Sequence, residues 1–358
     1  MTSRERMATL LKREIPDRMG IYEHFWPETL PAWRTQGFPQ DTDPAVYFEY
    51  DLRGVNGSWF NTAPDLGPEE VIEETDEWRV RKDGRGATLK YWKEKSGTPQ
   101  HIGFEISTPE KWNEAKQPLL TLDTQRLDIA ALRQGLEDAR KADKFSFYAN
   151  LFIFELMRAT LGDLCMMESM LLEPDWIRDF CETYTQHYIT HYDYMFREAG
   201  KPDGFFMYED LGFSNGLFCS PATLRELILP YYKRIVGFLH DNGLPVIFHT
   251  CGDVRKAVDI IIEAGFDCLQ PMEAKAGNNV IEFAKTYGRK ISYMGNIDVT
   301  VLNKNNPEKT RGEVEHKIRT MREMRIPYMF HSDHSVPPDI HFDTYRQAVE
   351  IFRENGKY

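Results

Sequence analysis

Apolar runs and amphipathic stretches alternate along the chain from residue 125 to the end. The amphipathic stretches include residues 174–200 and 223–243, each of which ends at a glycine, as helices often do. The apolar runs have the length of strands and are FSFYANL (145–151), GFFMYED (204–210), PVIFHTC (245–251), FDCLQPM (266–272), KISYMGN (290–296) and PYMFHSD (327–333). Strict alternation of strand and helix predicts parallel strands joined by right-handed crossovers and covered on both faces. We therefore predict an α/β barrel that occupies residues 1–358 as a single domain.

The first part of the chain has a less regular pattern. Residues 3–14 predict an amphipathic helix, and MGIYEHF (19–25) predicts a short buried strand. Residues 26–70 are rich in proline, glycine and aspartate, which favours ordered loops with short helices. In residues 71–106, near-alternating polar and apolar positions flank Asp83-Gly84, which predicts an antiparallel hairpin inserted into the barrel.

Composition narrows the classes of function. The net charge of -12 disfavours nucleic acid as a partner, because phosphate binding needs a basic surface. No apolar run is long enough to cross a membrane, and the charged N-terminal segment lacks the apolar core of a signal peptide. Five scattered cysteines favour a reducing compartment over a disulfide framework. We therefore expect a cytoplasmic enzyme; its oligomeric state stays open, with a homodimer among the arrangements considered.

Polar side chains follow the predicted strands at the point where each strand ends. In order along the chain they are Glu23 and His24, Asn150, Glu209 and Asp210, His249 and Cys251, Gln270 and Glu273, Asn296 and Asp298, and His331, Asp333 and His334. A single such residue is explained by a hydrogen-bonded group that closes a strand. In an α/β barrel, however, the strand ends meet at one face and carry the chemistry. The whole set therefore predicts an active site there.

The segment His249-Thr250-Cys251 suggests a metal site. In an extended segment, residues two positions apart point to the same side, so an imidazole and a thiolate can bind one ion together. This pair of donors suits Zn²⁺, which takes about four ligands and leaves one position open in a catalytic site. The third-ligand candidates at other strand ends are His334, Glu273, Cys268 and Glu209.

From Asp203 to about Arg353 the chain resembles the uroporphyrinogen decarboxylase superfamily. The segments that carry the resemblance are LPYYKRIVGFLHDNGLPVIFHTCGD, EAGFDCLQPME, GNIDVTVL and the closing HSDHSVPPD, with PDRMGIYE near the start similar to the opening strand. This resemblance implies a distorted (β/α)₈ TIM-type barrel. The excursion at 71–106 resembles the methyltransferase-like branches of the superfamily.

Two motifs distinguish the branches. The decarboxylases have an arginine-rich motif after the first strand that meets the carboxylates of the tetrapyrrole. Here that stretch is GIYEHFWPETLPAW, with no arginine before Arg34. The corrinoid-linked methyltransferases instead use zinc bound by His-x-Cys and a distant third ligand, usually cysteine. His249 and Cys251 match the first two positions, whereas His334 stands where that cysteine is expected.

The resemblance thus implies a zinc-dependent methyltransferase that moves a methyl group from a small methylated compound to a corrinoid (cobalamin) protein. Zinc acting as a Lewis acid fits O-demethylation, and an aromatic methyl ether is one donor that suits the aromatic-rich segments. The predicted metal ligands are His249, Cys251, His334 and Glu273. The predicted catalytic residues are Glu209, Asp210, Asp298 and His334, and the predicted substrate-binding residues are His24, Asn150, Tyr208, Asn296 and His331.

Three alternatives stay open at this point. One is a metal-free, decarboxylase-like lyase in which His334 and Asp210 perform acid–base chemistry. Another is a methyltransferase that moves the methyl group from methylcobalamin to a thiol. The third is a corrinoid- or tetrapyrrole-binding module without catalysis.

Overall fold

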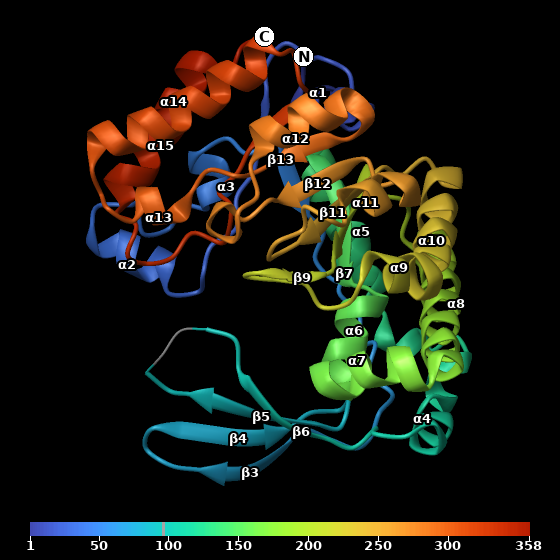
Figure 1. Ribbon diagram of the computed structural model, residues 1–358. Helices are drawn as coiled ribbons and strands as arrows, with labels where there is room; N and C mark the ends of the chain where they lie inside the picture. Colours follow the sequence, from blue (N-terminus) through green and yellow to red (C-terminus); the bar gives the residue numbers. More distant parts are fainter. Residues whose placement is uncertain (95–96) are drawn as a thin grey trace.

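The computed structural model describes residues 1–94 and 97–358, and its centre is an eight-stranded parallel sheet (Figure 1). In the order β1-β14-β13-β12-β11-β8-β7-β2, the strands are Gly20–Ile21, Tyr328–Phe330, Ser292–Met294, Cys268–Pro271, Val246–Thr250, Gly204–Tyr208, Phe145–Leu151 and Leu52–Gly54. The six strands predicted from residue 145 onward are all present and parallel, and the predicted first strand is confirmed in shortened form. β2 lies in the region where only loops and short helices were predicted, so that prediction was wrong at these three residues.

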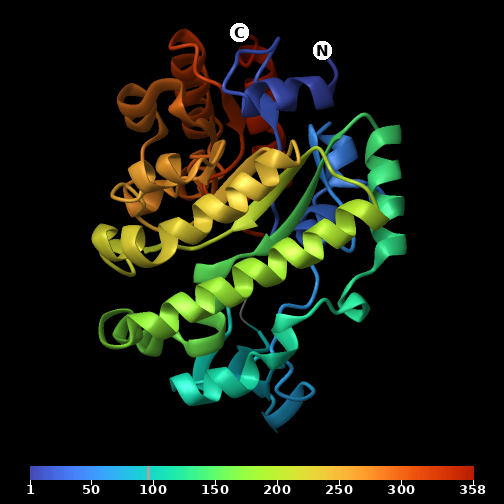
Figure 2. The same cartoon turned by 90° about the vertical axis from the view of Figure 1, so that its right-hand side faces the viewer.

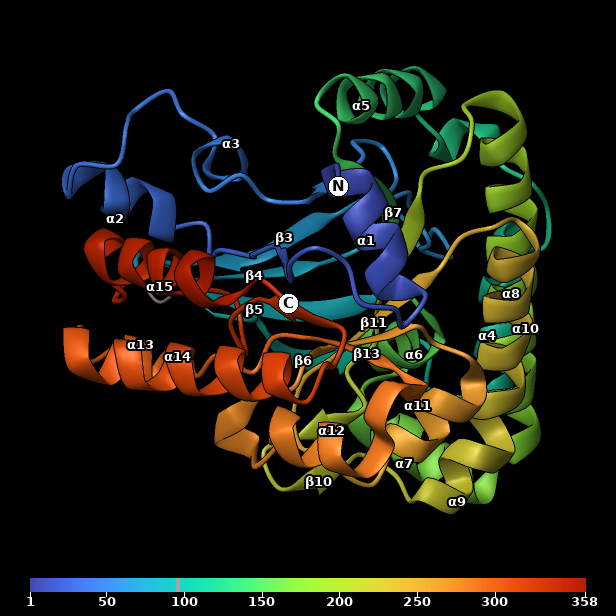
Figure 3. The same cartoon turned by 90° about the horizontal axis from the view of Figure 1, so that it is seen from above.

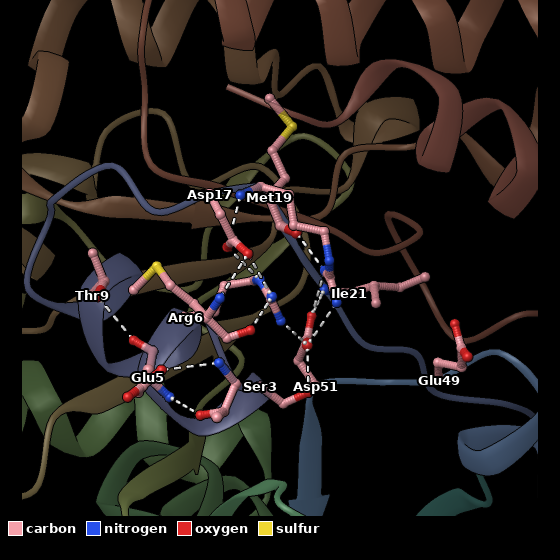
Figure 4. Close-up of polar contacts among 12 residues, drawn as sticks. Ser3, Glu5, Arg6, Thr9, Asp17, Met19, Ile21, Glu49 and Asp51 are labelled. Carbon is pink, nitrogen blue, oxygen red and sulfur yellow. Dashed lines mark hydrogen bonds and ion pairs between the residues drawn. The ribbon is translucent and has the colours of Figure 1, made fainter.

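The sheet closes into a barrel where its two outer strands meet. The backbone N–H of Asp51 donates to the carbonyl of Ile21 at 2.9 Å, and the Asp51 carboxylate accepts the N–H of Ile21 at 3.0 Å. The same fully buried carboxylate accepts hydrogen bonds from Arg6 at 2.9 Å and Arg18 at 2.8 Å (Figure 4). A side-chain carboxylate therefore replaces one backbone acceptor where β1 and β2 meet, and the barrel is distorted at this seam between its outer strands.

The barrel interior is filled by every second residue of the strands. One buried apolar cluster comprises Leu52, Phe145, Phe147, Ala149, Phe206, Ile247, Cys268, Met294 and Met329 together with Met7, Leu10 and Leu11 of α1 (Ser3–Leu11). The apolar residues between them on the strands belong to the larger cluster that packs against the helices. Helix α1 thus closes the amino-terminal end of the barrel, and Figure 3, viewed onto that end, shows it between two groups of helices.

Helices surround the sheet in the order expected for crossovers. Those of eight or more residues after α1 are α5 (Ile129–Lys141), α6 (Ile153–Leu161), α7 (Asp163–Leu172), α8 (Pro174–Glu198), α10 (Leu229–Asp241), α12 (Val280–Tyr287), α14 (Pro307–Glu323) and α15 (Phe342–Asn355). The shorter ones are α2 (Thr29–Thr35), α3 (Pro44–Tyr47), α4 (Pro109–Ala115), α9 (Pro221–Thr223), α11 (Val258–Ala264) and α13 (Val299–Leu302). Helices α8 and α10 run side by side across one flank (Figure 2). No helix in the described part of the chain is long and apolar enough to span a bilayer.

The helix predicted over 223–243 is interrupted in its first turns. Residues Leu224–Ile228 form a π-helical turn between α9 and α10. Pro230 has no N–H for the carbonyl four residues earlier, and the helix widens directly before it.

The inserted segment is larger than one hairpin. It forms a four-stranded antiparallel sheet in the order β3 (Glu70–Glu74), β4 (Trp78–Lys82), β5 (Ala87–Trp92) and β6 (Gln100–Phe104). The predicted hairpin at Asp83-Gly84 is the β4–β5 connection. Because the segment lies between β2 and α5, it leaves the barrel from the carboxyl-terminal end of a strand. It therefore stands on the face opposite the two chain termini, beside α6 and α7 (Figure 1).

Candidate metal centre

The two-residue period of the strands decides which predicted side chains meet inside the barrel mouth. Tyr208, His249, Gln270 and His331 follow the interior residues of β8, β11, β12 and β14 by two positions. Asp210 comes two positions after Tyr208, and Cys251 comes two positions after His249. Tyr208 and His249 are opposite each other in the register of β8 and β11, so Asp210 and Cys251 are neighbours as well.

Three of these side chains converge on one point. The Cys251 sulfur lies 3.4 Å from His249 Nε2, and an Asp210 carboxylate oxygen lies 3.5 Å from the same nitrogen. A ligand atom from each residue lies within 4.8 Å of those of the other two. The prediction that His249 and Cys251 point to the same side is confirmed. Within residues 1–94 and 97–358, this is the one group of three or more such side chains that are close enough to share an ion.

The chemistry of this donor set fits a divalent cation. Burial and the nearby charge of Asp210 raise the pKa of the Cys251 thiol well above its ordinary value. Burial acts to raise the pKa of Asp210 too, but the contact with His249, the backbone N–H of Cys251 and the charge of Arg158 together outweigh it and hold the pKa at about 2. A carboxylate, a thiol and an imidazole so close together match the ligands of Zn²⁺, which would also stabilise the thiolate.

A row of hydrogen bonds leads from His249 across the mouth. Its Nδ1 lies 2.5 Å from Gln270 Oε1, and Gln270 Nε2 lies 3.3 Å from Nε2 of His331. The same His331 nitrogen lies 3.0 Å from Nδ1 of His24, whose Nε2 is 2.9 Å from the Tyr208 hydroxyl. Three predicted substrate-binding residues therefore form one polar network with a predicted metal ligand.

Glu23 lies behind this network and is almost fully buried. It accepts hydrogen bonds from the backbone N–H and hydroxyl of Ser332 and from the backbone N–H of His24. Burial nonetheless raises the pKa of Glu23 to about 8.

Glu209 and Asn150 follow strand residues that point outward to the helices, so their side chains point away from the barrel interior. The two Glu209 oxygens accept the backbone N–H groups of Phe154 at 3.0 Å and Glu155 at 2.7 Å, and so cap the start of α6. Asn150 accepts the N–H of Leu151 at 3.0 Å. These contacts hold both residues behind the mouth, so the geometry gives their predicted catalytic and substrate-binding roles no support.

Asn296 and Asp298, the predicted site residues that follow β13, mainly connect loops. Asn296 bonds to the backbone of Val280, Met272 and Asn278, and Asp298 caps α13 through the N–H of Thr300. They lie near the site without joining the three-residue cluster.

Glu273 and His334 are likewise outside the cluster. Glu273 accepts the backbone N–H of Gly252 at 2.8 Å and forms an ion pair with Lys275, also at 2.8 Å. The His334 ring stacks on Trp26 with centroids 5.8 Å apart, and its Nδ1 lies 3.4 Å from the carbonyl oxygen of Ser335.

Sequence reasoning missed two groups beside the cluster. Arg158 of α6 forms ion pairs of 2.8 Å with Glu155 and Asp163, and its charge lowers the pKa of Asp210. Half-exposed Trp59, from the loop after β2, packs on Tyr208 with centroids 5.1 Å apart. Nothing in their local sequence identifies them as site residues. For Asp210 and Gln270, in contrast, the two-residue period of the strands indicates that they point into the mouth.

Comparison with known proteins identifies a family and structurally similar chains. The family model described as uroporphyrinogen decarboxylase (URO-D) matches residues 162–355. The structure is similar to a methyltransferase from Methanosarcina mazei, with a TM-score of 0.68, 15% identity and coverage of 99% of each chain. An endo-β-1,4-xylanase from Gloeophyllum trabeum gives a TM-score of 0.41, with 7% identity over 66% of this chain and 85% of that one. No curated protein matches the chain in sequence.

Proposed function

The chain belongs to the uroporphyrinogen decarboxylase family, and from this premise we propose that it is a zinc-dependent methyltransferase of the corrinoid-linked kind. It moves a methyl group from a small methylated compound to a corrinoid protein. The observation that carries the proposal is the convergence of Asp210, His249 and Cys251 at the mouth of the barrel.

These three residues would hold the metal, with Asp210 in place of a distant third ligand. Zinc bound there supplies Lewis acidity toward the oxygen of a methyl ether. Asp210 and Cys251 come from adjacent strands, and the backbone N–H of Cys251 donates to Asp210 at 2.8 Å, which orients the carboxylate. His249 is oriented by Gln270.

The side chains around the cluster favour an apolar or aromatic methyl donor. Tyr208 lies 5.0 Å from the His249 ring, and Trp59 continues this aromatic surface outward. The two cations whose charges act on the cluster are already paired, Arg158 with Glu155 and Lys275 with Glu273. A substrate with many carboxylates, such as a tetrapyrrole, therefore gains little here, which disfavours the decarboxylase-like alternative.

Metal analysis combined with a methyl-transfer assay tests the proposal. We expect the purified protein to carry about one zinc per chain and to methylate cob(I)alamin from a methoxyaromatic donor, followed by absorbance. His249→Ala and Cys251→Ala should lose both properties. The matched control is Cys165→Ala, because this half-buried thiol on α7 lies outside the cluster. A wild-type protein that binds no metal would refute the proposal.

A further inference from the structure

One backbone carbonyl determines where the protons lie in the row of hydrogen bonds. The carbonyl oxygen of Ser332 lies 2.6 Å from Nδ1 of His331 and can only accept. Nδ1 of His331 must therefore carry a hydrogen. Burial lowers the pKa of His331 to about 3, so the ring is neutral and its Nε2 is a bare acceptor.

This acceptor sets the amide of Gln270. Only the NH₂ end of the amide can donate to His331 Nε2, at 3.3 Å, so Oε1 faces His249. At 2.5 Å from Oε1, His249 Nδ1 must be the donor. In neutral His249 the other nitrogen, Nε2, is then bare, and it is the atom that faces Asp210 and Cys251.

The second branch of the row has the same polarity. Nδ1 of His24 donates to the same His331 nitrogen, so Nε2 of His24 accepts from the Tyr208 hydroxyl. Reversing the row would turn two bare acceptors, His331 Nδ1 and the Ser332 carbonyl, toward each other in a buried position. It would also put a hydrogen on the His249 nitrogen that faces the cluster.

We propose that Gln270 and His331 are positioning residues of the metal centre, which hold His249 in the tautomer that offers Nε2 to the ion. The Ser332 carbonyl anchors this arrangement from a strand end two strands away from β12 in the sheet order. The proposal rests on the metal site of the proposed function. Partners of this kind, which orient a ligand without touching the ion, typically change metal affinity 10- to 100-fold.

The test replaces the amide while keeping its size. In Gln270→Met the donor and acceptor are lost, and we expect the affinity for Co²⁺ alone, measured by titration of its visible absorption, to fall about 10-fold or more. Gln270→Glu keeps an acceptor for His249 Nδ1 and should recover most of that affinity, which a general packing defect would not allow. His331→Leu frees the amide to turn and should give a smaller loss. Gln186→Met, on the exposed face of α8, is the matched control and should bind Co²⁺ like wild type.

A second readout does not need the metal. Nitrogen-15 spectra of the metal-free protein distinguish the two imidazole tautomers, and His249, His331 and His24 should each carry the hydrogen on Nδ1. A His249 Nδ1 without a hydrogen, or unchanged Co²⁺ affinity in Gln270→Met, would overturn the inference alone. Wild-type protein that fails to bind Co²⁺ would overturn the metal site and the proposed function with it. Tight Co²⁺ binding with the expected tautomers but without methyl transfer would overturn only the function.

Discussion

The Asp210 carboxylate accepts the backbone N–H of Cys251 at 2.8 Å. This hydrogen bond holds the side chain that follows β8 against the backbone that follows β11. Tyr208 and His249 are opposite each other in the register of these strands, so the residues two positions further on meet as well. This relationship brings Asp210 into the three-residue cluster with His249 and Cys251.

Asp210→Ala should therefore weaken zinc binding by more than about 100-fold, beyond the loss expected for an outer partner of the metal. Asp210→Asn keeps one neutral oxygen donor, so its zinc affinity should lie between that of Asp210→Ala and that of wild type. Competition with a chromophoric chelator measures both affinities. Equal zinc affinity in Asp210→Ala and wild type would remove Asp210 from the ligand set.

His334→Ala should retain zinc, because the His334 ring stacks on Trp26 and lies outside the cluster. Its loss should instead reduce turnover if the ring contacts substrate. Metal content and methyl-transfer rate, measured on the same preparation, separate the two roles. Zinc-free His334→Ala would support the ligand role inferred from the family resemblance.

The protein should not convert uroporphyrinogen to coproporphyrinogen above background. The first strand is followed by GIYEHFWPETLPAW, and the cations beside the cluster are paired with carboxylates. A fluorescence assay of the oxidised porphyrin products tests this expectation. Measurable decarboxylation would favour the lyase over the methyltransferase.

The free energy of unfolding should depend on pH through Glu23. Burial raises the pKa of Glu23 from 4.5 in its ordinary environment to about 8 in the folded protein. The folded state therefore binds the proton more tightly, and this stabilisation, complete below about pH 4.5, is lost as pH rises toward 8. Relative to Glu23→Gln, wild type should lose about 1.4 kcal/mol per pH unit within that window. Urea unfolding of both proteins at several pH values measures the slope; parallel curves would contradict it.

Asp51→Ala should destabilise the barrel seam by about 1–3 kcal/mol, because the buried N–H of Ile21 loses its acceptor and Arg6 keeps only its ion pair with Asp17. The matched control is Glu354→Ala, which removes an exposed ion pair with Arg311 and should cost about 0–1 kcal/mol. Denaturant midpoints and slopes give both values. A loss for Asp51→Ala as small as that of the control would mean that the seam does not depend on this carboxylate.

The sequence alone was sufficient for the parallel barrel and for the pair His249 and Cys251. Both depend on local periodicity: a buried strand such as β7 is apolar along its length, and residues two positions apart share one side. The same period, applied to Phe206 and Tyr208, would have assigned Asp210 to the mouth and Glu209 to the outside.

The rest was decided by tertiary structure. β2 has only three residues, too few for a period to be recognised, and it forms because Asp51 and β7 hold it in place. The row from Ser332 to His249 joins residues 83 positions apart in sequence, and only the fold places Gln270 between His331 and His249. Hydrogen bonds between strand ends depend on the order in which strands pair around the barrel, and that order is set by packing over the whole chain.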